Sequence, residues 1–258
     1  MQQLDTESKS SVNTVDCDCV STRSTHGPYA GHNAQVVVDG KHGLIVHSDT
    51  VGASSDQGEM SEQILQAHSV LGKECTTAVA DAGYSDLEDL AKLEEQGIDV
   101  VVPIERQTDV QEGFEYDAQR DCYRCPEGHE LVFNGHEENR KRRRYKISPR
   151  STCKHCRRFG SCTTSRHGRS LARSDFHEEG LRLRAKYEEE SSQRVYAKRQ
   201  QLVEPPFGHI RRNLGVSAYL LRGREGTRAE TALFSLCYNV ARLIGMFGVS
   251  GLRAKLAI

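Results

Sequence analysis

Residues 78–104 read AVADAGYSDLEDLAKLEEQGIDVVVPI, and this stretch decides the fold of the first part of the chain. The small apolar residues at 78–80 are typical of the end of a buried strand, which stops at Asp81 because Asp is a poor strand former. A helical pattern at about 86–96 and an apolar strand at 98–104 follow. This order predicts an α/β unit in which Asp81 is either a turn residue or a strand-end carboxylate that could hold a metal ion.

The residues before this stretch extend the same pattern. Apolar runs at 34–38 and 43–48, joined by a short turn, predict two strands, and 11–15 is a possible strand leading into Asp16. Residues 59–71 place apolar side chains at helical spacing. We therefore expect a mixed sheet with helices packed against it.

Toward its C-terminal end the chain is again helical. The pattern predicts a helix over about 175–203 that must stop at Pro205 and Pro206, because proline lacks an N–H and disfavours helical geometry in the residue before it. A last helix at roughly 229–246 is apolar on most sides, so we expect it to be buried core. The resulting division is a disordered tail at 1–10, the first part of the core at 11–104, a cysteine-rich basic insertion at 105–174 and a helical completion of the core at 175–258.

Composition indicates a soluble, rather polar protein. Only 36% of the 258 residues are hydrophobic. No apolar run approaches the length of a membrane span, and the first residues show no signal peptide. We therefore expect a cytoplasmic protein with no membrane partner. The nine cysteines are an odd number, which favours reduced thiols and a possible metal site over a disulfide framework.

Four cysteines of the middle region have a spacing that suits zinc. Cys153 and Cys156 form a C-x2-C knuckle, Cys125 precedes it and Cys162 follows it. Four thiolates can close a tetrahedral Zn²⁺ site, and metal ligation would supply folding energy to so polar a stretch. Free thiols in a loop are the alternative. Further candidate ligands are Cys122, His129 and His155.

The same region is strongly basic. Residues 139–174 contain thirteen Lys and Arg and no Asp or Glu, which favours a surface for a phosphate backbone over an ordinary solvated face. The densest run consists of Arg140, Lys141, Arg142, Arg143 and Arg144.

Taken in order, these segments resemble the catalytic part of DDE transposases from prokaryotic insertion sequences, in the group whose DDE domain carries a cysteine-bearing insertion. The resembling stretches are VDCDC (15–19), YAGHNAQVVVDGKHGLIVHSD (29–49), VADAGYSDLEDLAKLEEQGIDVVVPI (79–104), FEYDAQRDCYRCPEGHEL (114–131), the Cys153, Cys156 and Cys162 cluster, RQQLVEPPFGHIRRNLG (199–215) and LRGREGTRAETALFSLCYNVARL (221–243). They run through nearly the whole chain. The resemblance implies a ribonuclease-H-like mixed sheet flanked by helices, and cleavage and joining of double-stranded DNA with two Mg²⁺ or Mn²⁺ ions. It also implies a prokaryotic, DNA-associated protein and a possible homo-oligomer.

The resemblance also implies which residues are catalytic. Asp81 in ADAGY matches the second acid of the family's triad, and Glu204 in VEPPFG matches the third. Asp16 in VDCDC is the best match for the first, with Asp18 and Asp39 as competing positions. These three acids would hold the metal ions that activate a water and then a 3′-hydroxyl.

Basic residues near the third acid are candidate phosphate contacts. Arg199 precedes Glu204, and Arg211 and Arg212 follow it. Alternatively, these three residues are ordinary exposed arginines without a DNA contact.

The sequence departs from the family at several positions. Cys17 stands where the family usually shows Pro, GHN at 31–33 replaces the usual G-Y-N, and only about fifteen residues precede Asp16, where a helical DNA-binding region is usual. The chain therefore resembles a catalytic fragment. The alternatives are an inactive remnant that acts as a zinc-containing DNA-binding protein, and a nuclease on the same fold.

Overall fold

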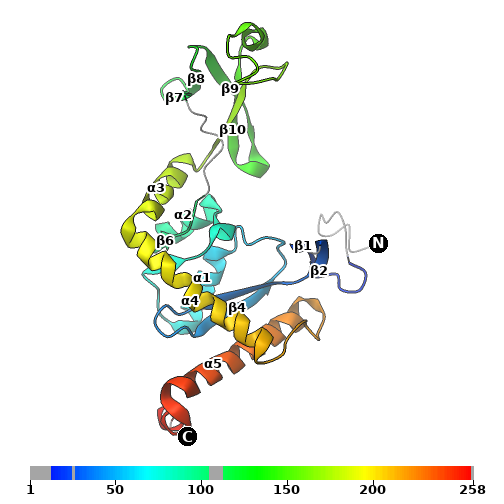
Figure 1. The fold of residues 1–258 in the computed structure, drawn as a ribbon, viewed down its shortest axis with the longest axis vertical. Coiled ribbons are helices and arrows are strands. Elements are labelled where there is room, and N and C mark those ends of the chain that lie inside the picture. Colours follow the sequence, from blue (N-terminus) through cyan, green and yellow to red (C-terminus); the bar gives the residue numbers. More distant parts are fainter. Residues whose placement is uncertain (1–12, 25–26, 105–112, 257–258) are drawn as a thin grey trace. The chain divides into compact units, whose positions relative to one another are not determined.

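The computed structural model describes residues 13–24, 27–104 and 113–256. The chain divides into two compact units: unit 1 within residues 1–103 and 185–258, and unit 2 within residues 104–184. Figure 1 colours the ribbon along the sequence. The tail expected at 1–10 lies outside the described residues.

Unit 1 is built on two pairs of strands with helices against them. β3 (Asn33–Val38) and β4 (Ile45–Val51) form an antiparallel hairpin, and β5 (Thr77–Val79) pairs in parallel with β6 (Asp99–Val101). The helices between them are α1 (Met60–Leu71) and α2 (Leu87–Glu95), with a short 3₁₀ helix at Ala82–Tyr84. These elements confirm the strands and helices predicted in this part of the chain. Among the described strands of unit 1 the hydrogen-bonded pairs are separate two-stranded sheets, not the single mixed sheet that the sequence suggested.

The core of unit 1 comes from the apolar faces of these elements. Leu90 and Leu93 of α2 are completely buried, and the apolar strand predicted at 98–104 is buried at Val100, Val101 and Val102. Because a parallel strand pair is covered by its crossover helix, this run reads as continuously apolar rather than alternating.

The segment before Asp16 is a turn rather than a strand. The Asn13 side-chain oxygen accepts hydrogen bonds from the amides of Val15 and Asp16, at 2.8 and 3.2 Å. An Asn side chain that bonds to the backbone two and three residues on favours a turn over a sheet ladder. The strand suggested at 11–15 is therefore wrong for the described residues 13–15.

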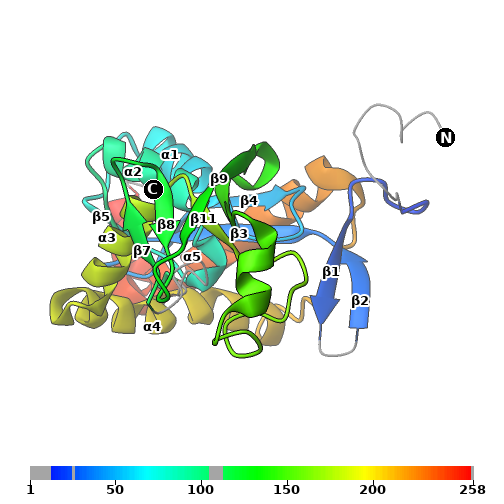
Figure 2. The same cartoon turned by 90° about the horizontal axis from the view of Figure 1, so that it is seen from above.

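A second hairpin follows Asp16. β1 (Val20–Ser24) pairs antiparallel with β2 (Gly27–Gly31). Figures 1 and 2 show this hairpin on the opposite side of unit 1 from α1 and α2.

Two helices replace the single one predicted at 175–203. α3 (His177–Glu188) ends at Glu189, whose backbone is extended, and α4 (Glu190–Arg212) continues through Pro205 and Pro206. The expected stop at the prolines is wrong. A proline inside a helix costs about 3 kcal/mol or more, and the complete burial of Pro206 offsets part of that cost.

The last helix, α5 (Gly223–Lys255), is longer and more exposed than predicted. Its buried residues are Thr227, Glu230, Thr231, Ser235 and Tyr238, so the expectation of an apolar buried core helix is wrong. Leu233, Leu236 and Val249 are more than half exposed. Among the described helices, α5 alone has the length and composition that could cross a membrane, and a single helix of this kind is weak evidence for a span.

An ion pair ties β4 to α5 and makes stability depend on pH. Burial by itself would raise the pKa of Asp49, but hydrogen bonds from Arg228 and from the Thr50 amide outweigh it and lower that pKa below the usual 3.8. A carboxyl whose folded pKa is lowered stabilises the protein above its unfolded pKa, and this contribution is lost as the pH falls through the folded value. We expect Asp49→Asn protein to lose less stability than wild type in urea unfolding between about pH 5 and pH 2. Equal losses of stability in the two proteins would contradict a contribution of the Asp49–Arg228 pair.

Unit 2 is an antiparallel sheet with its own core. The strand order is β11–β10–β9–β8–β7, with β7 at Glu115–Asp117, β8 at Cys122–Arg124, β9 at Glu130–Glu137, β10 at Arg142–Ile147 and β11 at Ser170–Ser174. Short 3₁₀ helices span Glu138–Arg140 and Arg150–His155. The core cluster consists of Tyr123, Leu131, Tyr145, Ile147 and Leu171.

Candidate active site and cysteine cluster

Asp81 lies directly beyond the end of β5, where the sequence places it. Its Oδ1 accepts a hydrogen bond from the Gly83 amide at 2.9 Å and so caps the short 3₁₀ helix. Its Oδ2 lies 2.5 Å from a guanidinium nitrogen of Arg199 on α4, which packs along β5 and β6. The Asp81 side chain is 43% exposed, so the carboxylate is both paired and accessible.

A second carboxylate, Asp56, lies beside Asp81. A side chain at Gly83 would meet Asp81 Oδ1 at 2.9 Å and Asp56 Oδ2 at 3.3 Å, so the absence of a Cβ there allows both acids to approach. Asp56 Oδ1 accepts hydrogen bonds from Gln35 at 2.7 Å and from Asn33 at 3.0 Å. Asp56 was not among the site residues predicted from the sequence. The sequence signal for a polar partner here was the spacing of Asn33 and Gln35, because residues two apart on a strand point to the same face and can bind one acceptor.

Tyr84 completes this network. Its hydroxyl donates to the Gln35 side-chain oxygen. Burial, together with the charges of Asp56 and Asp81, raises the pKa of Tyr84 far above its usual value. Tyr84 is therefore a protonated donor that orients Gln35.

Asp16 is held in a different part of unit 1. Its Oδ2 accepts a hydrogen bond from the Gly223 amide at the start of α5 and lies 3.0 Å from Nε2 of His32, while Oδ1 accepts from the Asp18 amide. The Gly223 amide makes the largest contribution to a lowered pKa of Asp16. Cys19 lies against the same ring, with Sγ 3.5 Å from His32 Nε2. Burial and then the Asp16 carboxylate raise the pKa of the Cys19 thiol.

The two competing first acids each have a structural role in the fold. Asp18 accepts a hydrogen bond from the Arg224 amide at 2.8 Å and so helps to cap α5. Asp39 accepts from the amides of Lys41 and His42 and closes the β3–β4 turn. Both contacts are typical of acids that stabilise helix ends and turns.

Glu204 is exposed inside α4, on the same helix as Arg199. In the described part of the chain, the group of His, Cys, Asp and Glu whose ligand atoms all lie within 4.8 Å of one another is Asp16, Cys19 and His32. The structure thus brings Asp81 together with Asp56 and Arg199, and Asp16 together with Cys19 and His32. Asp16, Asp81 and Glu204 do not form one such group.

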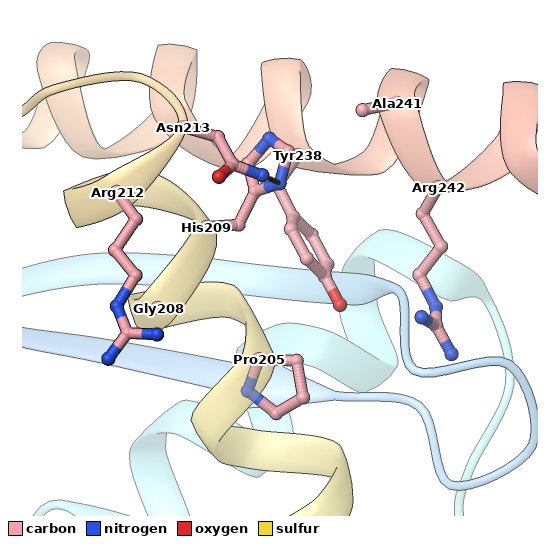
Figure 3. Close-up of a pocket in the computed structure, with 8 residues that line it drawn as sticks. All are labelled: Pro205, Gly208, His209, Arg212, Asn213, Tyr238, Ala241 and Arg242. Carbon is pink, nitrogen blue, oxygen red and sulfur yellow. Dashed lines mark hydrogen bonds between the residues drawn. The ribbon is translucent and has the colours of Figure 1, made fainter.

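A basic cavity begins next to Glu204, between α4 and α5. Its volume is about 430 Å³. Figure 3 shows Arg212 of α4 and Arg242 of α5 on either side of His209 and Tyr238. Asn213 bonds to the His209 ring, with the two nitrogens 2.8 Å apart. Two guanidinium groups facing one hollow can bind a phosphate. Arg212 was predicted as a phosphate contact, whereas His209 and Asn213 had no predicted role. Arg242 was not predicted, because it lies on a different helix far along the chain.

In unit 2 the four predicted zinc ligands surround one small cavity of about 30 Å³. Backbone amides donate to three of these sulfurs: His129 to Cys125 at 3.4 Å, Arg169 to Cys153 at 3.3 Å and Arg158 to Cys156 at 3.4 Å. All nine cysteines of the chain are free of disulfides. Thiolates that accept backbone N–H bonds suit zinc, although no three of these described sulfurs lie within 4.8 Å of one another.

Part of the basic run is neutralised inside unit 2. Arg142 and Arg144 pair with Glu137 at 2.6 and 2.5 Å, and Arg143 pairs with Asp121 at 3.3 Å. Both acids precede residue 139, where the acid-free stretch begins; β9 pairs with β10 and brings Glu137 beside Arg142, and Asp121 lies in the turn before β8. The run therefore has less free positive charge than its sequence suggests.

Residues 124–244, just under half of the chain, match a family model described as a transposase DDE domain. The matched segment contains Glu204, Arg199, the four cysteines and the cavity between α4 and α5, whereas Asp16 and Asp81 precede it. Over this segment the chain is similar to a transposase DDE domain, and this similarity suggests a transposase function. No curated protein and no solved structure matches the chain.

Proposed function

We propose that this chain is the catalytic part of a DDE transposase from a prokaryotic insertion sequence, which cleaves DNA at the element's ends and joins the freed strand to target DNA. The observation that carries the proposal is the placement of Asp81 at the end of β5 against α4. α4 also carries Glu204 and lies in the segment similar to the transposase DDE domain. A ribonuclease-H-like core and the prokaryotic cytoplasm are parts of the same proposal.

Asp16, Asp81 and Glu204 would hold two Mg²⁺ or Mn²⁺ ions in this proposal. Bound there, the ions would supply Lewis-acid activation of a water and of the 3′-hydroxyl. The residues fit in kind, because hard dications prefer carboxylate oxygens and Asp81 is partly exposed. Arg199 offsets the charge of Asp81 without ions, and its guanidinium would be free to contact a phosphate once a cation replaces it.

Isothermal titration with Mn²⁺ at low salt tests the metal site directly. We expect heat of binding in the wild type and none in the Asp81→Asn, Glu204→Gln double variant, because two of three carboxylate ligands are removed. Asp39→Asn is the matched control, since Asp39 closes a turn and should leave binding unchanged. Equal binding in all three proteins would overturn the assignment of these ligands.

The cavity between α4 and α5 is proposed to contact the DNA backbone. We expect Arg212→Gln to weaken binding of a short duplex and to reduce the salt dependence, d log K/d log[salt], by about 1. Arg143→Gln is the control, because Arg143 is already paired with Asp121. Fluorescence anisotropy at several salt concentrations measures both quantities. A larger effect for Arg143 than for Arg212 would place the DNA on unit 2.

Zinc held by Cys125, Cys153, Cys156 and Cys162 is the remaining part of the proposal, with a structural role in unit 2. Homo-oligomers are proposed on family grounds alone.

A zinc-containing DNA-binding protein without catalytic activity is the second candidate. It is favoured by one observation: Asp16, Asp81 and Glu204 do not form a group within 4.8 Å among the described residues. Duplex binding with no cleavage in Mn²⁺ or Mg²⁺ would support it. Cleavage without joined products would instead indicate a nuclease on the same fold.

A further inference from the structure

We propose that Asp16, Cys19 and His32 form a zinc site in unit 1, separate from the cysteine cluster of unit 2. One carboxylate oxygen, one sulfur and one ring nitrogen of these residues all lie within 4.8 Å of one another. The shortest pair is Asp16 Oδ2 and His32 Nε2 at 3.0 Å, and Cys19 Sγ lies 3.5 Å from the same nitrogen. Separations of this size bring three donor atoms to one ion of the size of Zn²⁺.

The donor set selects a borderline transition-metal ion. Mg²⁺ and Ca²⁺ prefer oxygen ligands, whereas a thiolate and an imidazole favour Zn²⁺ or its spectroscopic substitute Co²⁺. Three protein ligands leave a fourth position for water or another ligand.

The surroundings hold the ligands in place. The side chains of His32 and Asp16 are only 6% and 11% exposed. The amides of Gly223 and Asp18 donate to the two Asp16 oxygens, which fixes the carboxylate as outer-sphere partners fix metal ligands. The edge-to-face contact of His32 with Tyr219, with ring centroids 6.0 Å apart, fixes the ring. A dication would also balance the negative charge that a Cys19 thiolate brings beside Asp16 and Asp18.

The proposal does not depend on the proposed transposase activity, because metal binding at this site is measured in the absence of DNA. It does give His32 a role, at a position where the sequence departs from the G-Y-N of the family it resembles. Zinc bound here would engage Asp16 Oδ2, the same carboxylate that is the candidate first catalytic acid.

Cobalt titration of the metal-depleted full chain, followed by its thiolate-to-cobalt absorption, is the test, together with zinc counting by mass spectrometry. We expect Cys19→Ser and His32→Gln each to lose about one metal equivalent per chain relative to wild type. Cys17→Ser and Cys75→Ser are matched controls that should lose none. Cys75 is the sharper control, since its sulfur lies 3.3 Å from His68 Nε2 but no third ligand of this kind joins the pair among residues 13–24, 27–104 and 113–256. The unit 2 cysteines are identical in all these proteins, so the differences report on this site alone.

His32→Cys provides a gain of signal that loss of folding cannot imitate. We expect this variant to retain its metal and to absorb more strongly in the thiolate-to-cobalt band, because a second thiolate joins the site. Wild-type stoichiometry and spectrum in the Cys19→Ser, His32→Gln double variant would overturn the proposal. An unchanged spectrum in His32→Cys would also overturn it.

Discussion

DNA cleavage by Asp81→Asn protein is expected to fall at least about 100-fold below wild type, since even residues that only orient a metal ligand cost about 10- to 100-fold. The Asn amide has nearly the shape of the carboxylate but lacks its negative charge, so it still accepts from the Gly83 amide while binding a dication poorly. Nicking of supercoiled plasmid in Mn²⁺ measures the rate. Glu204→Gln is expected to have an effect of the same size.

Two acids serve as controls for this experiment. The first control is Glu190→Gln. Glu190 lies on the same helix as Glu204, but its carboxylate pairs with the exposed Arg194. Asp39→Asn changes an acid that closes a turn. Both should retain the wild-type rate within a few-fold. A nicking rate that survives Asp81→Asn, or that falls equally in the controls, would contradict the catalytic assignment. Comparing Asp16→Asn with Asp18→Asn then identifies the first acid.

Tyr145→Ala is expected to destabilise unit 2 by about 3–5 kcal/mol, the usual cost of deleting a large aromatic ring from a core. Tyr145 is completely buried, and its ring packs edge-to-face against Tyr123 with centroids 5.0 Å apart. Its hydroxyl donates to Asp121 at 2.7 Å, so the substitution also leaves that carboxylate with fewer donors. Hydrogen exchange of the β9 and β10 amides in the full chain reports on unit 2 separately from unit 1.

Phe133→Ala is the matched control for Tyr145. Phe133 lies on the neighbouring strand and contacts the Tyr145 ring at 6.0 Å, but it is 44% exposed. We therefore expect less than half of the Tyr145 effect, because about half of its surface already meets water. Equal protection losses in the two variants would show that the ring pair, rather than burial, stabilises this sheet.

Local patterns were sufficient to predict most of unit 1. The apolar runs at 34–38 and 43–48 and the short turn between them predicted the β3–β4 hairpin, and helical spacing at 59–71 predicted α1, because both signals come from residues close in sequence. Asp81 was placed at the end of its strand for the same reason. Local propensity failed at Pro205 and Pro206, where tertiary burial of Pro206 outweighs the intrinsic preference of proline.

Features that depend on distant segments were not predictable. Nothing in the loop around Asp56 indicates that it lies beside Asp81, and the paired state of Arg143 depends on Asp121, 22 residues earlier. The apolar character of α5 suggested burial, yet its buried face is mainly polar, and Leu233 and Leu236 are exposed. The meeting of Asp16 and Cys19 with His32 likewise depends on the path of the β1–β2 hairpin.

The proline pair of α4 has a mechanical consequence. In a regular helix the amides of residues 205 and 206 would bond to the carbonyls of Gln201 and Leu202, and prolines cannot supply those bonds. The helix therefore has a compliant joint directly after Glu204, with Arg199 on one arm and Arg212 on the other. If DNA bound at Arg212 pulled on α4, the helix would bend at this joint instead of moving as one rigid element.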